Sequence, residues 1–476
     1  MRSVAGTNAY SPPPKSCSNQ RAAFMLHAAP AGSGGIFQAM PWRPFLALYR
    51  PRFRRSILLV VGVCALANYL WMSLISFFVL RLPFPDFNDF FLGAQALKQG
   101  LDPYHDFLIY NHYDFAHFYL YPPIVAWLVQ PLLPLGLENA SLLVLLLLQA
   151  CVVAFFWFVY QALRPLSKDE IAFGVILSLS FGPIFANLGN DQVNVLVLLF
   201  SGVSLLAYCR ADHWWGGAAY GLAMGIKPLQ PAVGLLLVWG RRTRMVVAAA
   251  ILGLIALLIP GPRLAFEFVF KVLPIISRGT GFRANASPSG LLERLFSPTS
   301  FFTGVASGNP WVRALDLAVI AAVVLVTWWR LGRQPRKTTL GRASEMAVAV
   351  AASPLVLTIA NSWHLVLLLV PILVLIRIGL ARADGWVLFS AILAFLLIGP
   401  AYDGMLRMLA DNQGWFSSAG GGLALRVLNE CQLAGMITLW LGCLRALGAG
   451  SSQEQSLKPS ESPAMDSSHG TIASES

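Results

Sequence analysis

The sequence predicts an all-α polytopic membrane protein, and three observations lead to this expectation. Of the 476 residues, 57% are hydrophobic and only 12% are charged, whereas a soluble domain carries about 25% charged residues. Apolar runs of about 20 residues, the length that crosses the hydrocarbon core, recur along the chain. The alternating pattern of a membrane β-barrel is missing from the sequence, so helices must satisfy the backbone amides in lipid.

The charge and the cysteines of the chain agree with this class. The formal net charge is +12, but the basic residues cluster between apolar runs, where they set the membrane orientation. We therefore expect membrane lipids as neighbours and no nucleic-acid partner. The six cysteines are scattered and include no CxxC pair, so we interpret them as small hydrophobic residues.

Composition divides the chain into three parts. Residues 1–50 are basic and rich in Pro, Gly and Ser, so we expect a disordered cytoplasmic segment. They lack the layout of a signal peptide, and we expect translation to begin at Met25 or Met40, which N-terminal sequencing tests. Residues 51–447 are expected to form the membrane domain, and 448–476 a polar, disordered cytoplasmic tail.

Arginines determine the expected orientation. Four arginines between 50 and 55 precede the first apolar run, which places the N-terminus in the cytoplasm and the loops 81–139 and 261–310 outside it. Later basic runs agree with this phase, so we expect about 12 spans, with both termini cytoplasmic, in the bacterial inner (plasma) membrane. The expected spans and short paired segments are 56–80, 140–163, 170–187, 192–209, 214–226, 229–240, 245–260, 311–329, 344–360, 363–377, 385–400 and 427–447.

The first outer loop contains two further segments of interest. A short amphipathic helix is expected near 89–98. The segment 120–135 is apolar, but four prolines interrupt it, and proline disfavours a regular helix interior. The sequence therefore leaves open whether this segment spans the membrane, re-enters it or lies flat on it.

The same loop opens with the stretch FPDFNDFF at 84–91. Asp86 and Asp89 have the spacing of a capping box, with Asp86 as the N-cap and Asp89 at the third helical position. The alternative is catalytic, because a carboxylate in a partly apolar loop has a raised pKa and can accept a proton from an attacking hydroxyl. The local sequence leaves both interpretations open.

Other polar residues lie at expected outer turns. Lys227 interrupts an apolar stretch, where it could meet a phosphate or extend its amine to the surface. His364 could donate to a phosphate or satisfy a helix end. Asp191, Gln192 and Asn194 crowd one turn, where they either bind sugar hydroxyls or hold the hairpin together.

The outer loop 261–310 carries basic residues on the side that the orientation rule disfavours, with Arg283 and Arg294 among them. One interpretation is that the loop holds a lipid-linked phosphate at the membrane surface. The other is that a loop of this length escapes the rule. We keep both interpretations.

Metal and nucleotide sites have little support in the sequence. Three histidines and three aspartates lie between 102 and 117, but their spacing matches no tight metal signature. A P-loop or GxGxxG cradle is not evident either. We therefore expect no metal and no cofactor, and the sequence does not favour an ATP-driven pump.

Five segments between about 84 and 375 follow one another on one side of the expected topology. They are PDFNDFFLGAQALKQGLDPY with YPPIVAWLVQPLLPL, then LGNDQVNVLVLLF, GLAMGIKPLQPAVGLLLVWGRR, RANASPSGLLERLF and SPLVLTIANSWHLVLLLVP. In this order they resemble glycosyltransferase family 87, whose members are polyprenyl-phosphate-mannose-dependent mannosyltransferases and relatives with the GT-C fold. Each motif is weak alone, but the set covers most of the membrane domain in the right order.

The resemblance implies a GT-C fold with a catalytic first extracytoplasmic loop. It also implies that a sugar, with mannose as the first candidate, moves from a polyprenyl-phosphate donor to a hydroxyl of a lipid or glycan acceptor. The family's D-F-x-x-F pattern falls on Asp86, which becomes the implied general base, with Asp89 in reserve. The implied contacts are Lys227, His364, Arg283 and Arg294 for the donor phosphate, and Asp191, Gln192, Asn194 and Asn285 for the sugar or acceptor.

The sequence departs from the family pattern at three places. Extra residues precede Gln192, Ala286 stands where Gln is usual, and Asn361 stands where small residues are common. These differences leave the donor sugar and the acceptor open. Two alternatives therefore stay beside the main expectation: a GT-C enzyme that uses another lipid-phosphate sugar, and a transporter or flippase of a lipid-linked sugar. A transporter would place more polar residues at the midplane than at one outer face.

Overall fold

The computed structural model describes residues 51–75, 85–105, 119–210, 212–282, 284–296, 309–332, 336–399 and 419–456. These residues are mostly helical and contain no strand, apart from an isolated bridge between Asn285 and Asn361. The expectation of a helical chain is therefore confirmed for the part that the structure describes. The segments expected to be disordered, 1–50 and most of 448–476, lie outside these ranges.

The chain divides into two compact units, Met1–Arg55 and Ser56–Ser476. Of the first unit, the described residues include only the start of α2, and every helix from α4 onward belongs to the second. In the first half of the chain the elements are α2 (Pro51–Leu70), η1 (Trp71–Ile75), α4 (Pro85–Lys98), α6 (Pro123–Val129), η2 (Gln130–Leu135), α7 (Gly136–Leu163), α8 (Lys168–Leu179), α9 (Gly182–Leu188) and α10 (Asn194–Arg210).

The segment 120–135, which the sequence leaves open, forms α6 and η2 and leads into α7. Together they make a helix of 41 residues, Pro123–Leu163. A proline lies in the first turn of α6, where the missing N–H has no helical partner to lose. Two further prolines fall in η2, a short 3₁₀ turn. Gly136 follows with a φ of 73°, a conformation that glycine adopts without strain.

The expected span 170–187 is wrong as a single helix, because the structure divides it into α8 and α9. Ser167 and Glu170 form a capping box that begins α8, which fixes its N-terminal end. Pro183 lies in the first turn of α9. Since proline supplies no N–H and clashes with a preceding helical turn, the chain restarts there rather than continuing.

The second half of the chain follows the expected segments closely, and α11 has the predicted limits 214–226. The last helix continues to Ser456, so the first residues of the expected polar tail are helical. The elements are α11 (Trp214–Ile226), α12 (Pro231–Trp239), α13 (Thr243–Leu258), α14 (Pro262–Glu267), η3 (Phe268–Val272), α15 (Leu273–Ile276), α16 (Pro288–Phe296), α18 (Pro310–Leu331), α19 (Thr339–Val356), η4 (Ser362–Leu368), α20 (Leu369–Arg382), α21 (Gly385–Ile398) and α23 (Ala419–Ser456).

Length and composition make the chain a membrane protein. Four of the described helices are long and apolar enough to cross a bilayer, and a fifth span results if α13 and the helix Pro262–Ile276, bent by 108°, count as one. Three shorter apolar helices add to these: Leu58–Ser73, Asn194–Arg210 and Gly385–Ile398. The expected count of about 12 spans and the GT-C fold stay predictions.

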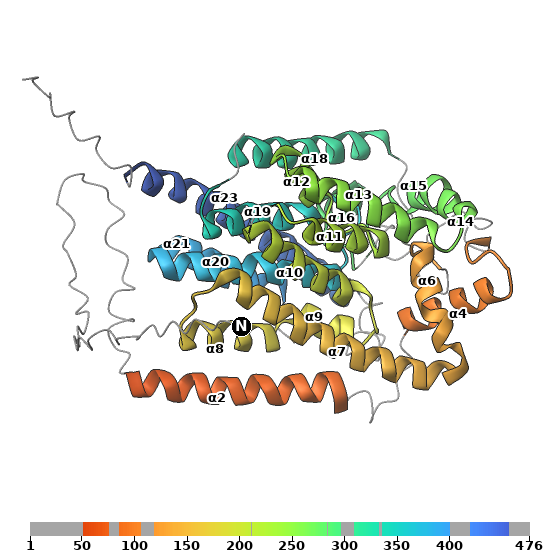
Figure 1. Cartoon of the computed structure of the whole chain (residues 1–476), viewed down its shortest axis with the longest axis horizontal. Coiled ribbons are helices and arrows are strands. Elements are labelled where there is room, and N and C mark those ends of the chain that lie inside the picture. The colour runs from red at the N-terminus through yellow and green to blue at the C-terminus, as the bar shows by residue number, and fades with distance from the viewer. Residues whose placement is uncertain are drawn as a thin grey trace, which may run out of the picture. The chain divides into compact units, whose positions relative to one another are not determined.

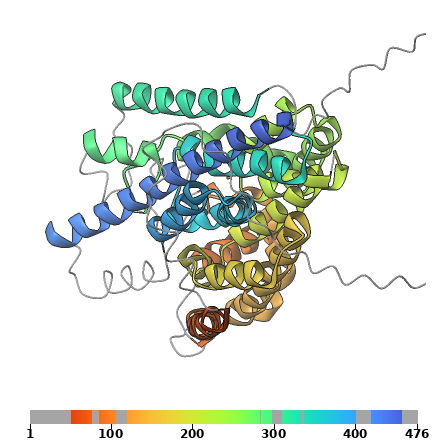
Figure 2. The same ribbon diagram turned by 90° about the vertical axis from the view of Figure 1, so that its left-hand side faces the viewer.

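The bundle has a buried centre and an exposed flank. In its most apolar stretch, Ser362–Arg382 is 83% buried inside the protein, whereas Pro310–Leu331 is 22% buried. Figures 1 and 2 accordingly show α18 along one flank of the bundle. Small residues bring α11 and α13 together: a Cβ on Gly217 would lie 2.0 Å from the Met245 carbonyl oxygen, which is the close approach that glycine permits in membranes.

Candidate functional site

One end of the bundle carries the candidate site. The elements α4, α6, α14 and α15 lie together there, on the right of Figure 1, and α4 packs on α6. Phe87, Phe90 and Phe91 are buried and fasten α4 to this end. The ring of Phe90 meets that of Tyr121 edge-on, with 4.5 Å between centroids. This packing holds the first turn of α4 against the bundle.

Asp86 lies in that first turn, not before the helix as the capping-box interpretation places it. Its carboxylate accepts a hydrogen bond from Nε2 of Gln192. Asp89, one turn further along α4, is partly buried. The structure thus brings Asp86 to a residue more than 100 positions away in the chain, which a capping role does not require.

Gln192 joins three groups from separate parts of the chain. Its Nε2 donates to Asp86 and to the Tyr121 hydroxyl at 3.0 Å, and its Oε1 accepts from Nζ of Lys227 at 3.3 Å. The Lys227 amine also lies 4.7 Å from the Tyr121 ring centroid, which is cation–π range. We call Asp86, Tyr121, Gln192 and Lys227 the Gln192 network. It links a carboxylate to an amine through one amide.

The turn between α9 and α10 determines where Gln192 points. Asp191 adopts a left-handed φ of 48°, which Asp tolerates better than most residues. Its buried carboxylate accepts from the Ser141 hydroxyl of α7, and the Gln192 N–H donates to the Asn187 carbonyl at 2.9 Å. The turn is therefore fastened on both sides. Of the three polar residues predicted in this turn, Gln192 reaches Asp86 while Asp191 is bonded to α7.

Asn194 belongs to α10 and His364 to η4, and these two elements contact each other. Asn194 donates to the Asn187 side chain at 2.8 Å, and Asn187 donates to the Trp363 carbonyl at 2.7 Å. His364 follows in η4, and its Nδ1 accepts from the Asn361 N–H at 3.2 Å. His364 also interacts electrostatically with Lys227. The structure therefore brings His364 near the amine end of the Gln192 network and leaves Asn194 as a link between helices.

Burial raises the pKa of both carboxyls of α4. Burial raises the pKa of Asp86, while the hydrogen bond from Gln192 and the charge of Lys227 act against that rise. Burial also raises the pKa of Asp89, to about 7, and the nearby charge of Asp86 adds to the effect. A carboxyl with a pKa in this range can take and return a proton near neutral pH.

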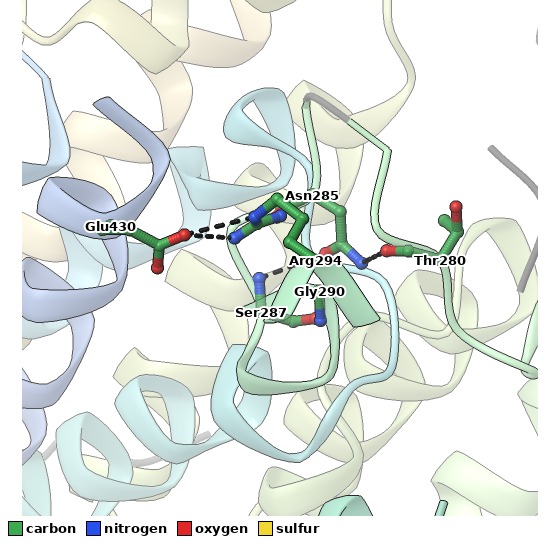
Figure 3. A network of polar contacts seen from close by, with 6 residues as sticks. All are labelled: Thr280, Asn285, Ser287, Gly290, Arg294 and Glu430. Atoms are coloured by element: carbon green, nitrogen blue, oxygen red, sulfur yellow. Dashed lines mark hydrogen bonds and ion pairs between the residues drawn. The ribbon is translucent and has the colours of Figure 1, made fainter. Parts of the chain in front are cut away.

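Asn285 lies in a second polar cluster, drawn in Figure 3. Its Nδ2 donates to the carbonyls of Thr280 at 2.7 Å and Thr358 at 3.0 Å. Its Oδ1 accepts from the N–H groups of Ser287 at 3.1 Å and Ala360 at 2.9 Å. An amide side chain has two donors and two acceptor sites, so Asn285 is fully used in joining the loop before α16 to the end of α19.

Arg294 extends this cluster to the last helix. It pairs with Glu430 of α23 at 2.8 Å and donates to the Asn285 carbonyl at 2.7 Å, as Figure 3 shows. Its side chain is 3% exposed, against 36% for that of Glu430. We call Thr280, Asn285, Ser287, Arg294 and Glu430 the α16 network. Arg283, the other arginine predicted in this loop, lies outside the described residues.

Sequence reasoning missed Tyr121 and Glu430. Tyr121 begins the quoted stretch YPPIVAWLVQPLLPL, and its place before two prolines was the available signal, because proline extends the preceding residue. Glu430 has no comparable signal, since its partner is 136 positions away. Metal ligation has no support in the described ranges, where no group of three or more His, Cys, Asp or Glu side chains gathers. Most of the histidine-containing loop lies outside those ranges.

The fold and this site define a helical membrane protein with a carboxylate and an amine joined at one end. The model of glycosyltransferase family 87 matches residues 119–358, about half of the chain. The chain therefore belongs to glycosyltransferase family 87, as the resemblance implied, and it is a glycosyltransferase that uses a sugar donor and an acceptor. The match includes Gln192 and Lys227 but begins after Asp86. A search of curated proteins finds no match.

Proposed function

We propose that the protein transfers a sugar, with mannose as the first candidate, from a polyprenyl-phosphate donor to a hydroxyl of a lipid or glycan acceptor. The reaction takes place at the extracytoplasmic face of the bacterial inner membrane. The observation that carries this proposal is the Gln192 network, which places an acid beside an amine across one amide. Sugar transfer from a phosphate needs a base at the acceptor hydroxyl and a positive charge at the leaving phosphate.

Asp86 is the proposed general base. Its carboxylate takes the proton of the acceptor hydroxyl as the acceptor oxygen forms a bond to the anomeric carbon of the donor. The bond from that carbon to the phosphate oxygen breaks, and polyprenyl phosphate leaves as a monoester. A raised pKa at Asp86 makes the carboxylate a better proton acceptor. Asp89 is the reserve base, because its pKa is also raised.

Lys227 and His364 are the proposed contacts of the donor phosphate. Negative charge grows on the leaving phosphate, and a preorganised amine stabilises that charge. Nζ of Lys227 donates to the side-chain Oε1 of Gln192 and can offer its remaining protons to a phosphate. His364 is close enough to interact with that amine. Gln192 then has a second role beyond contact with the sugar or acceptor, because it fixes the distance between base and phosphate site.

The other predicted site residues receive more indirect roles. Asp191 and Asn194 are bonded to Ser141 and Asn187, which favours a role in shaping the turn that presents Gln192. Asn285 similarly shapes its loop. Arg294 stays a candidate for the donor phosphate only if it leaves Glu430, and Arg283 stays a candidate from the same loop.

The proposal includes the topology expected from the sequence. About 12 spans in the GT-C arrangement, with both termini cytoplasmic, would place α4 and the turns of Gln192 and Lys227 outside the cytoplasm. Their meeting at one end of the bundle supports this arrangement. A flippase would need such a polar site nearer the midplane.

Transfer assays with a panel of donors test the proposal. Purified full-length protein in nanodiscs is given labelled polyprenyl-phosphate-mannose, polyprenyl-phosphate-glucose or a sugar nucleotide, together with a membrane-extract acceptor pool. We expect new glycosidic product from a polyprenyl-phosphate donor and none from the nucleotide or from empty nanodiscs. Product from the nucleotide alone would contradict the donor class. Movement of labelled lipid across a liposome without a new glycosidic bond would instead support transport.

A further inference from the structure

The described part of the chain contains an apolar groove away from the candidate site. It lies between α7, α8 and α20 and has a volume of about 370 Å³, within the range of ligand pockets. Its part of α7 runs from Phe156 to Leu163, whereas Ser141 of the same helix lies beside Asp191. A rise of 1.5 Å per residue separates these places by about 20–30 Å. The groove is therefore a distinct feature, and its interpretation does not depend on the proposed reaction.

The walls of the groove suit a lipid chain. Its lining is apolar, with one ion pair, Arg377 and Glu170, as the exception. It lies on α7, part of a span-length apolar helix, so hydrocarbon rather than water faces it. Trp157 and Tyr160 are 53% and 38% exposed at its edge. Exposed Trp and Tyr concentrate at the level of lipid headgroups, so this part of the groove is expected to lie near the interface.

The end of the groove beside Leu163 is positively charged. Arg377 donates to Glu170 at 2.8 Å and to the Leu163 carbonyl at 3.3 Å, so this cation is already compensated. Arg164 follows the end of α7 and Lys168 begins α8. Both side chains are exposed and form no ion pair within the described residues. The three cations Arg164, Lys168 and Arg377 outnumber the two acids Asp169 and Glu170 at this end. The excess positive charge beside an apolar groove complements a lipid with a negative head and an apolar chain.

We propose that the groove of α7, α8 and α20 holds an acyl chain of an anionic glycerophospholipid, whose headgroup contacts Arg164 and Lys168. The ion pair of Arg377 and Glu170 closes the polar end of the groove and separates headgroup from chain. A bound lipid of this kind adds to the contacts that Arg377 already makes with Glu170 of α8 and with the Leu163 carbonyl of α7.

Lipid binding to the delipidated full-length protein tests this site. Native mass spectrometry measures the affinities for phosphatidylglycerol, phosphatidylcholine and undecaprenyl phosphate. The head variant is Arg164→Gln with Lys168→Gln, and the chain variant is Gly174→Leu. A Cβ at Gly174 meets Leu373 at 3.5 Å, an ordinary contact, so the added side chain is expected to enter the groove. Val153→Phe is the control, because Val153 is an exposed residue of α7 outside the groove.

We expect the wild type to prefer phosphatidylglycerol over phosphatidylcholine. Since each surface cation contributes about 1 kcal/mol toward an anionic lipid, the head variant should bind phosphatidylglycerol about 30-fold more weakly. Its phosphatidylcholine affinity should not change, while the chain variant should weaken both and the control neither. Equal binding of the two phospholipids by the wild type would overturn the proposal. So would a head variant with unchanged preference, or undecaprenyl phosphate binding that is tighter than phosphatidylglycerol binding and is weakened by both the head variant and the chain variant.

Discussion

The Gln192 network and the α16 network both consist of polar residues that are buried or partly buried, but their hydrogen bonds connect different kinds of partner. In the α16 network, Asn285 uses all its donors and acceptors on backbone groups, and Arg294 meets a carboxylate. In the Gln192 network, one amide connects two ionisable groups, Asp86 and Lys227. The first network joins loops to helices, while the second joins charges whose protonation can change.

This difference indicates a structural role for the α16 network and a chemical role for the Gln192 network. A polar group bonded to backbone keeps its partner whatever the pH, and removing it leaves a buried atom unsatisfied. A carboxylate held by an amide beside an amine can change its charge without breaking the fold, and such perturbed groups cluster at functional sites. Substitutions in the α16 network should therefore affect stability, and substitutions in the Gln192 network should affect transfer.

The largest expected effect is on transfer, from Asp86→Asn. The amide side chain keeps the shape of the carboxylate but takes no proton, so kcat should fall about 10³-fold, within the usual range for a general base. The melting temperature should not fall, because the substitution removes a buried charge. Transfer assays and thermal melts of the same preparation measure both quantities.

Asp89→Asn is the matched control for this prediction. It removes a carboxyl of the same helix that forms no hydrogen bond with Gln192 within the part of the chain that the structure describes, so a modest change in kcat is expected. If Asp89→Asn lost transfer and Asp86→Asn did not, the base would move to Asp89. If neither variant lost transfer, the Gln192 network would have no part in proton transfer.

Lys227→Met should have the second largest effect. Methionine preserves length and apolar packing but removes the positive charge from the proposed phosphate site, so kcat should fall about 10²-fold. Lys227→Arg is the control, because it keeps the charge and should retain more activity despite its different shape. Equal losses in both variants would mean that packing against Tyr121, not charge, is what Lys227 supplies.

Much of the helical layout could be predicted from the sequence, because apolar run length carries that information directly. The limits 214–226 of α11 are an example. The prediction of one span at 170–187 was wrong because a new helix starts at Gly182, with Pro183 in its first turn. The apolar pattern continues through this proline and does not show the break. The segment 120–135 stayed open because its prolines suggested a break, whereas a short 3₁₀ turn absorbs them.

The sequence indicated which residues belong to the candidate site, but it did not indicate which of them contact one another. Asp86, Gln192 and Lys227 stood out as polar residues at apolar turns, but nothing in the sequence said that they touch. The contact between Asp86 and Gln192 joins residues 106 positions apart in the chain, a tertiary relation that no local sequence pattern reveals. The partners of Asn285 were hidden for the same reason: a family motif marked the residue, but only the structure shows that its side chain joins two loops. Its expected contact with the sugar or acceptor stays a prediction.

The third prediction concerns stability rather than transfer. Arg294→Met leaves Glu430 without its partner and the Asn285 carbonyl without a donor, which should lower the free energy of unfolding by about 2–3 kcal/mol. Arg445→Met is the control, because the pair of Arg445 with Asp384 is more exposed and 3.4 Å long, and such pairs contribute about 0–1 kcal/mol. Transfer per folded molecule should not change, and a large loss would assign Arg294 to the donor phosphate.

The next prediction concerns the pH dependence of stability. Because burial raises the pKa of Asp89 to about 7, the folded state holds this proton more tightly than the unfolded state, and stability falls as pH rises from about 4 to 7. Asp89→Asn should therefore melt at the wild-type temperature at pH 4 and above it at pH 8. Glu138→Gln, which changes an exposed carboxyl of α7, is the control. Parallel melting curves of wild type and Asp89→Asn would refute the raised pKa.

The smallest expected effect is that of the Tyr121 hydroxyl, and it tests whether this group acts through Gln192 or independently of it. Tyr121→Phe removes one acceptor of Gln192 but keeps the ring beside Lys227, so kcat should fall about fivefold, the value of one neutral hydrogen bond. Tyr104→Phe, which removes a hydroxyl bonded to the Tyr121 carbonyl, should lower stability instead. If Asp86→Asn and Tyr121→Phe combined lost no more than Asp86→Asn alone, the hydroxyl would act only by holding Gln192 on the base. If the losses multiplied, Tyr121 would have a contact of its own with the substrate.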